Sequence, residues 1–264
     1  MKRLDRAMIL ALILCLLLTA VMIPALTLAK SPGYYRRAFA RTGLYERIGE
    51  DGVTYRAAIW FVGGEEDRVA LLSDAQLDAI ALHITTYLRG DTDDFTLVLD
   101  GVHLNGEYQD GVSLFGEAAI LHMKDVRALI RAADLTAAVL ACLLPFLIFY
   151  IAIRRREIGG GLLRGILCFY GVLLAAALVF ILVSALLDRG ELGLARALWR
   201  NLHYLFFPFR PEKVNASFFN DALTFILRVD LFMGAVYTVL GILAGALALL
   251  VGAAVWLKRY EKTQ

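Results

Sequence analysis

Four long apolar segments constrain this chain more than any other feature of its sequence. They cover residues 8–29, 135–153, 165–187 and 231–257, and none contains Asp, Glu, Lys or Arg. A helix needs about 20 consecutive apolar residues to cross the ~30 Å hydrocarbon core of a bilayer. It also satisfies its own backbone hydrogen bonds, which a lipid environment requires. The sequence therefore predicts a mainly α-helical integral membrane protein with four transmembrane helices.

Basic residues gather beside these segments on one predicted side of the membrane. They precede the first segment, occupy the link between the second and third, and follow the fourth. Loops rich in Lys and Arg stay in the cytoplasm. We therefore expect a multi-pass protein of the bacterial cell membrane with both termini in the cytoplasm. The net charge of +2 reflects this orientation and predicts no nucleic-acid partner. The first segment is expected to be retained, because it is longer than an ordinary signal-peptide core.

The apolar segments divide the chain into five parts, two of which face outward. The predicted parts are a tail with the first helix (1–29), a small extracytoplasmic domain (30–134), the second and third helices with their basic link (135–187), a helical outer loop (188–230), and the fourth helix with its tail (231–264).

Local signals predict three helices in the outer domain. Residues 31–49 are expected to form an amphipathic helix rich in tyrosine. Ser73 and Gln76 have the spacing of a capping box, and Gly90 is expected to end the helix that they open. Another helix is expected to begin near Gly116 and to continue towards the second membrane span.

Neither the cysteines nor the aspartates of this chain predict a metal site or a disulfide. All three cysteines lie within apolar segments, so neither a disulfide framework nor a cysteine metal site is expected. Asp91, Asp93 and Asp94 lack the glycine and the closing glutamate of a calcium loop, so a solvated loop is expected. No metal is predicted.

The candidate catalytic groups are histidines of the two outer segments. His122 shares a helix face with Val126 and Leu129, and Asp125 flanks it at position i+3. On spacing alone, His122 is either a buried core residue or a catalytic group. His203 shares a predicted face with Arg196 and Arg200.

The environment of His203 also allows two interpretations. Nearby cations lower the pKa of a histidine, and a neutral imidazole is a competent base near pH 7. The alternative is an interfacial aromatic belt with arginines that reach towards the headgroups. The two other histidines, His83 and His103, are expected at the surface.

Two short motifs carry a resemblance to a known family. Residues 121–126 read Leu-His-Met-Lys-Asp-Val, which resembles the His-Met-x-Asp-Val signature of the bacterial lipoprotein intramolecular transacylases. His203 is followed by Phe-Phe-Pro at 206–208, similar to the second signature of that family. Asp221 and Leu223 match an Asp-x-Leu pair. The resemblance extends to the order of the four helices.

This resemblance implies an acyltransferase reaction. The sn-2 acyl chain of a diacylglyceryl-modified N-terminal cysteine would move to the α-amino group of the same cysteine, giving the lyso-form lipoprotein. His122 and His203 would be the catalytic pair. From its position on the helix, Asp125 would either orient the His122 ring or pair with the adjacent polar stripe of Lys124, Arg127 and Arg131. The expected partners are diacylglyceryl-modified bacterial lipoproteins and membrane lipid, and no cofactor is implied. Further supporting residues would be Tyr204, Arg196, Arg200 and Arg210. Because a guanidinium suits oxygen acceptors, Arg196, Arg200 or Arg210 is expected to contact a headgroup or an ester carbonyl.

The alternative function is non-enzymatic: a membrane chaperone or sensor whose outer domain binds a partner. Convergence of the two histidines, 81 positions apart, would favour the enzyme. His122 precedes the second span by 13 residues, or roughly 20 Å of straight helix. We therefore expect this helix to tilt, to lie along the surface, or to break near residues 132–134.

Overall fold

The structure is a computed structural model that describes most of the chain outside residues 155–221. It describes residues 3–41, 44, 47–48, 54–55, 57–62, 67–104, 106–154, 165–166, 168–172, 175, 179, 222–227 and 229–263. The chain divides into two compact units. The first comprises Met1–Ala25, Ala133–Arg200 and Tyr237–Gln264, and the second comprises Leu26–Ala132 and Asn201–Val236.

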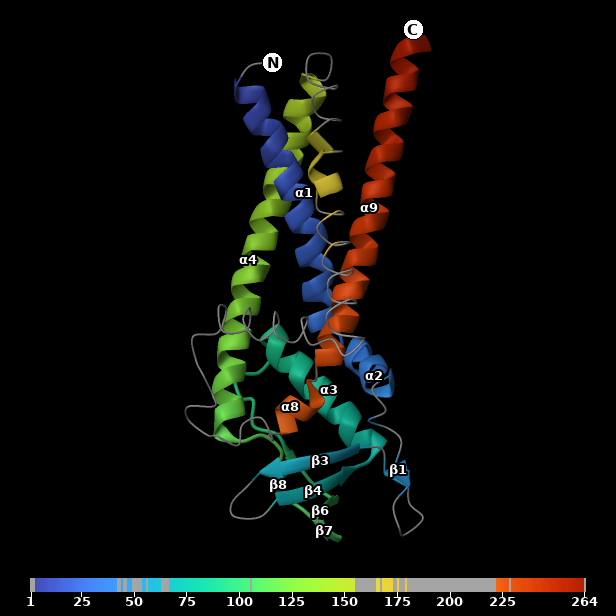
Figure 1. Cartoon of the computed structure of the whole chain (residues 1–264). Helices are drawn as coiled ribbons and strands as arrows, with labels where there is room; N and C mark the ends of the chain where they lie inside the picture. Colours follow the sequence, from blue (N-terminus) through green and yellow to red (C-terminus); the bar gives the residue numbers. More distant parts are fainter. Residues whose placement is uncertain are drawn as a thin grey trace. The chain divides into compact units, whose positions relative to one another are not determined.

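The described elements are six helices and eight short strands (Figure 1). The helices are α1 (Arg3–Ala29), α2 (Pro32–Arg41), α3 (Asp74–Arg89), α4 (Glu117–Ile153), α8 (Ala222–Ile226) and α9 (Val229–Thr263). The strands are β1 (Arg47–Ile48), β2 (Thr54–Tyr55), β3 (Ala57–Val62), β4 (Asp67–Leu72), β5 (Val98–Leu99), β6 (Val102–Leu104), β7 (Glu107–Gln109) and β8 (Val112–Ser113).

Two of the predicted membrane spans are confirmed as long apolar helices. Both α1, with 27 residues, and α4, with 37, are long and apolar enough to cross a bilayer. The fourth predicted span lies within the continuous helix α9. The third lies largely outside the described residues, although its described positions are helical. A total of four spans therefore stays a prediction.

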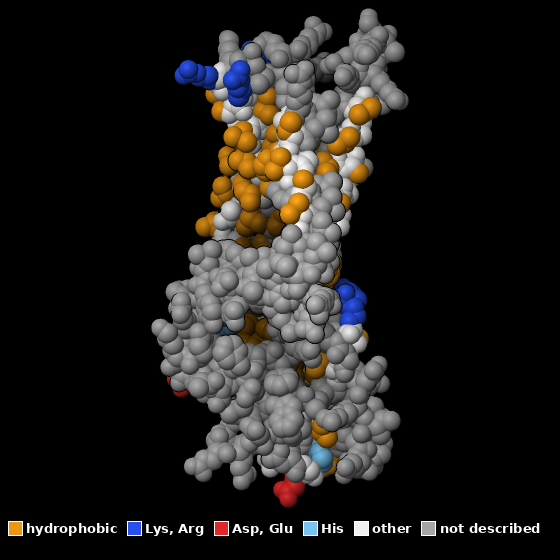
Figure 2. All heavy atoms as spheres, in the orientation of Figure 1, with side chains coloured by type: hydrophobic (Ala, Val, Ile, Leu, Met, Phe, Trp, Pro, Cys, Tyr) orange, Lys and Arg blue, Asp and Glu red, His pale blue; other side chains and the backbone are white. Residues whose placement is uncertain are grey.

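Many large apolar side chains of the first unit are exposed on its surface. Along α4, Leu135, Phe146 and Phe149 are 69%, 73% and 67% exposed. Figure 2 shows apolar side chains over the helices of this unit, with Lys and Arg at the end where the chain begins. An apolar surface of this extent marks contact with lipid or with another apolar partner. Membrane insertion accounts for it here.

The buried carboxylate of Asp5 joins two helices of the first unit. Asp5 is 2% exposed, and its Oδ1 accepts a hydrogen bond from Tyr150 Oη at 2.9 Å. Arg154 Nη2 lies 3.5 Å from the same oxygen. The start of α1 therefore lies beside the end of α4. Asp5 also lies in the first turn of α1, where a negative charge is favourable for the helix dipole.

The second unit is built on an antiparallel sheet with helices and one apolar core. Its strands follow the order β3-β4-β6-β7, and two smaller sheets pair β1 with β2 and β5 with β8. The core draws residues from α2, α3, the start of α4, and α8. Its largest fully buried side chains include Tyr87, Phe39, Phe95, Leu77 and Met123.

The predicted capping box of α3 is confirmed. The Ser73 side chain accepts from the Gln76 backbone N–H at 3.3 Å, and the Gln76 side chain accepts from the Ser73 N–H at 2.8 Å. At the other end, Gly90 has φ of 92°, a left-handed conformation that favours glycine. Both helix boundaries follow from residues that the sequence analysis identified.

Tyr34 ties α2 to the first turn of α9. Its hydroxyl donates a hydrogen bond to the Leu231 carbonyl. At Gly234, an added Cβ would lie 3.0 Å from Arg41 Nη2 and 3.5 Å from Tyr34 Oη, so this approach suits glycine. Burial raises the pKa of the Tyr34 hydroxyl, and the opposing effect of Arg41 is smaller. The hydroxyl therefore stays protonated and remains a donor.

Tyr35 ties α2 to the end of α1 in the same way. Its hydroxyl donates to the Ala29 carbonyl at 3.1 Å. Burial, and then the neighbouring Tyr34, raises the pKa of Tyr35 well above its usual value. The tyrosines that suggested an amphipathic helix therefore connect α2 to the helices before and after it in the core.

The predicted extent of that helix is wrong. It ends at Arg41, and Arg47–Ile48 form strand β1 paired with β2, where a helix to residue 49 was expected. Phe39 is the last buried apolar residue of α2. Farther along, the backbone of Arg47 and Ile48 pairs with β2. The helix predicted near Gly116 is confirmed, since α4 begins at Glu117.

We predict that Ser73→Ala lowers the free energy of unfolding by about 1 kcal/mol. The change removes the acceptor for the Gln76 N–H and leaves the first turn of α3 without its cap. Thermal unfolding in detergent measures the shift. Ser113→Ala, at an exposed strand position, is the matched control and should change stability little. Equal effects of the two changes would contradict the capping role.

Candidate functional site

His122 lies in the second turn of α4 and is buried in the second unit. Its side chain is 6% exposed, and its Nδ1 is enclosed by protein. Neighbours on the helix, Ala118, Ala119 and Met123, belong to the apolar core of this unit. The backbone of α4 continues without a break through residues 132–134. The predicted break is therefore absent, and a tilted or surface-lying helix stays a prediction.

Asp125 follows His122 by three residues on the same helix. Its Oδ2 is enclosed, and no described residue gives that oxygen a hydrogen bond. Orientation of the His122 ring by Asp125 therefore stays a prediction.

The other predicted site residues lie outside the described part of the chain. These are His203, Tyr204, Arg196, Arg200 and Arg210. Convergence of His203 with His122 consequently stays a prediction, as do the lipid contacts expected of the arginines.

The second outer segment nevertheless contributes described residues to the same core as α4. Ala222, Leu223 and Ile226 of α8 are 1%, 3% and 1% exposed. They belong to one apolar cluster with Ala119 and Met123, the neighbours of His122 on α4. The second unit is therefore assembled from both outer segments.

Two other histidines are more enclosed than the surface positions that we predicted. His83 Nε2 lies 3.1 Å from the Phe95 carbonyl oxygen, and the centroids of the tilted His83 and Phe95 rings are 5.4 Å apart. The His103 ring meets the Tyr108 ring edge-on at 5.0 Å. Each ring is half-buried, because a neighbouring strand or loop covers it. Their contacts are those of structural side chains.

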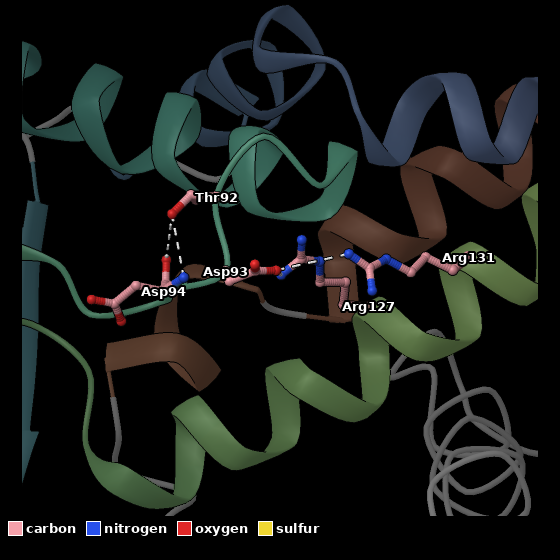
Figure 3. Close-up of polar contacts among 5 residues, drawn as sticks. All are labelled: Thr92, Asp93, Asp94, Arg127 and Arg131. Carbon is pink, nitrogen blue, oxygen red and sulfur yellow. Dashed lines mark hydrogen bonds and ion pairs between the residues drawn. The ribbon is translucent and has the colours of Figure 1, made fainter.

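Arg127, a member of the predicted polar stripe of Lys124, Arg127 and Arg131, is a buried cation. Its side chain is 7% exposed, its Nη1 lies 2.8 Å from Asp93 Oδ1, and its guanidinium stands 4.7 Å from the Tyr87 ring centroid. Figure 3 shows Asp93 facing Arg127 and Arg131 from the loop after α3. Arg131 is 63% exposed and 3.9 Å from the same oxygen. The partners of Arg127 come from other elements, which a helical wheel does not show.

The acidic loop at residues 91–94 makes contacts of its own. Asp94 Oδ1 accepts from the Thr96 N–H at 2.8 Å, and Thr92 Oγ1 accepts from the Asp94 N–H at 3.3 Å. Hydrogen bonds from Thr96 lower the pKa of Asp94, with smaller contributions from His83 and Lys124. In the described part of the chain, no group of three His, Cys, Asp or Glu could hold a metal ion. This loop leads from α3 to β5.

Comparison with known proteins identifies the fold. No family model and no curated protein matches the chain. Its fold is similar to that of a membrane-integral enzyme, the lipoprotein intramolecular transacylase Lit from Bacillus cereus, solved as two variants with one histidine replaced by alanine or by arginine. The TM-score is 0.58, over 99% of this chain and 96% and 95% of those chains, at 13% identity. The fold is therefore that of a membrane-integral protein.

We predict that Asp93→Asn lowers the free energy of unfolding by about 1 kcal/mol, because it removes the carboxylate that pairs with the buried Arg127 cation. Asp93 is 93% exposed, so solvent weakens the pair. Chemical denaturation in detergent measures the change. Asp91→Asn, in the same exposed loop, should stay within about 0.5 kcal/mol of the parent.

A double-mutant cycle separates this ion pair from other effects on the loop. In an Arg127→Met background, Asp93→Asn should cost little further stability, because the cation is gone. Additive losses from the two changes would contradict the assignment.

Proposed function

We propose that this chain is a membrane acyltransferase that converts diacylglyceryl-modified lipoproteins to the lyso form. The sn-2 acyl chain moves from the glycerol oxygen to the α-amino nitrogen of the same N-terminal cysteine. The fold of a membrane-integral transacylase supports the general kind of reaction. The specific reaction rests on the two histidine motifs.

The shared core of the second unit is the observation that carries this proposal. One outer segment supplies His122, and the other supplies α8, whose buried residues join the cluster around Ala119 and Met123. A mechanism with His122 and His203 requires that these two segments fold together. The described contacts meet that requirement for the segments, and the meeting of the imidazoles remains part of the proposal.

The reaction needs proton transfer at two atoms. The α-amino group of a cysteine has a pKa near 7.7–8.0, so much of it is protonated at neutral pH. One histidine takes a proton from the ammonium, and the free amine attacks the ester carbonyl carbon. A C–N bond forms and the C–O bond to glycerol breaks. The other histidine accepts a second proton from the nitrogen and passes it to the leaving glycerol oxygen, and the amide keeps the third.

Neither a serine nor a cysteine nucleophile is needed, because the substrate provides the amine. Donor ester and acceptor amine belong to one molecule, so holding them in register supplies much of the rate. Arg196, Arg200 or Arg210 would contact the headgroup or the ester carbonyl, since a guanidinium suits oxygen acceptors. Tyr204 would support His203.

We predict that His122→Ala and His203→Ala each lower conversion at least ~100-fold, because each removes an acid–base group. Mass spectrometry of lipoprotein N-terminal peptides, from cells with and without each variant, measures the lyso product. His83→Ala is the control and should retain turnover, since His83 contacts the Phe95 carbonyl.

The two histidines should also act as one unit. A His122→Ala/His203→Ala double variant should be no slower than the slower single variant, because either loss already disables the proton relay. Normal lyso product from a folded single variant would remove that histidine from the mechanism.

A further inference from the structure

Asp125 presents an enclosed carboxylate oxygen for which the described chain offers no donor. Its Oδ2 is buried, and no described residue hydrogen-bonds to it. A carboxylate oxygen withdrawn from water without a donor is costly. Such a group is retained where a ligand supplies the missing donor, or where a mobile neighbour does.

The nearby cations of α4 do not supply that donor. Arg127 directs Nη1 to Asp93 at 2.8 Å, and Arg131 also reaches towards Asp93. Lys124 is exposed to solvent. The described arginines and lysine of α4 therefore donate no hydrogen bond to Asp125 Oδ2.

The position of Asp125 relative to His122 narrows the kind of ligand. Residues three apart on a helix are neighbours, with Cβ atoms roughly 5–6 Å apart. A group bound between the two side chains would contact a carboxylate and an imidazole together. A primary ammonium fits, because it has a positive charge and several N–H donors, one of which an imidazole can accept.

We propose that Asp125 binds the α-ammonium group of the substrate's N-terminal cysteine and holds that nitrogen beside His122. This inference rests on the proposed acyl transfer and assigns to Asp125 a contact with the substrate itself. A carboxylate stabilises the charged amine, so Asp125 acts in binding and leaves proton removal to a histidine. An N-terminus that is already acylated lacks the charge, so the same contact selects for unmodified amines.

Binding of unreactive analogues tests this contact. The probes are two dialkylglyceryl-cysteine peptides with ether links, which cannot transfer an acyl group; one has a free α-amine and the other is N-acetylated. Affinities are measured at pH 6.5 for the full chain in detergent micelles or nanodiscs. The parent protein should bind the free amine roughly 10- to 100-fold more tightly, the size of one charge-assisted hydrogen bond.

In Asp125→Asn this preference should disappear, while affinity for the acetylated probe stays unchanged. Asp91→Asn, an exposed carboxylate of the same unit, should keep the full preference. Asp125→Glu retains the charge and should keep part of it, and Asp125→Ser gives a second neutral variant if Asp125→Asn does not fold. Thermal unfolding checks each variant.

An intact amine preference in folded Asp125→Asn or Asp125→Ser would overturn the inference. If such a variant also turned over an ester substrate more slowly, Asp125 would be a positioning residue for His122. Loss of preference without any lyso product from the parent would refute the acyl transfer and leave the ammonium site standing.

Discussion

The uninterrupted backbone of α4 is the constraint on which the rest of the account depends. One helix, from Glu117 to Ile153, begins in the core of the second unit and continues into an apolar segment long enough to span a membrane. His122 occupies its second turn, so the candidate catalytic side chain and a predicted membrane span belong to one helix. A helix also leaves no backbone group unsatisfied in lipid. The proposed site for a lipid-linked substrate thus lies on the helix that also carries a predicted span.

The second unit is held together by contacts between distant parts of the chain. Tyr34 and Tyr35 of α2 hydrogen-bond to the carbonyls of Leu231 and Ala29, at the start of α9 and the end of α1. Arg127 pairs with Asp93 and so joins α4 to the loop after α3. These polar contacts surround an apolar core to which both outer segments contribute. The proposed chemistry therefore sits in a unit held by packing as well as by hydrogen bonds.

Features with local signals could be predicted from the sequence, and those that depend on pairing could not. Long apolar runs predicted α1 and the membrane segment of α4, and Ser73 with Gln76 predicted the start of α3. The sheet β3-β4-β6-β7 was missed, because β6 and β7 have only three residues each and the pairing of β4 with β6 bridges the whole of α3. The burial of Arg127 was not predicted for a similar reason, since it depends on Tyr87 and Asp93. His122 and Asp125 could be named from their motif, but the enclosed Oδ2 of Asp125 required the structure.

An isotope crossover experiment tests the central claim most directly. Purified protein is given a mixture of two synthetic diacylglyceryl lipopeptides, one with deuterated acyl chains and a heavy peptide, the other fully light. Intramolecular transfer leaves the intact mass unchanged, so fragment spectra must locate the acyl chain on the cysteine nitrogen. The account predicts N-acylated lyso products that are wholly heavy or wholly light. Mixed heavy–light products, or no N-acylation by the folded protein, would contradict it.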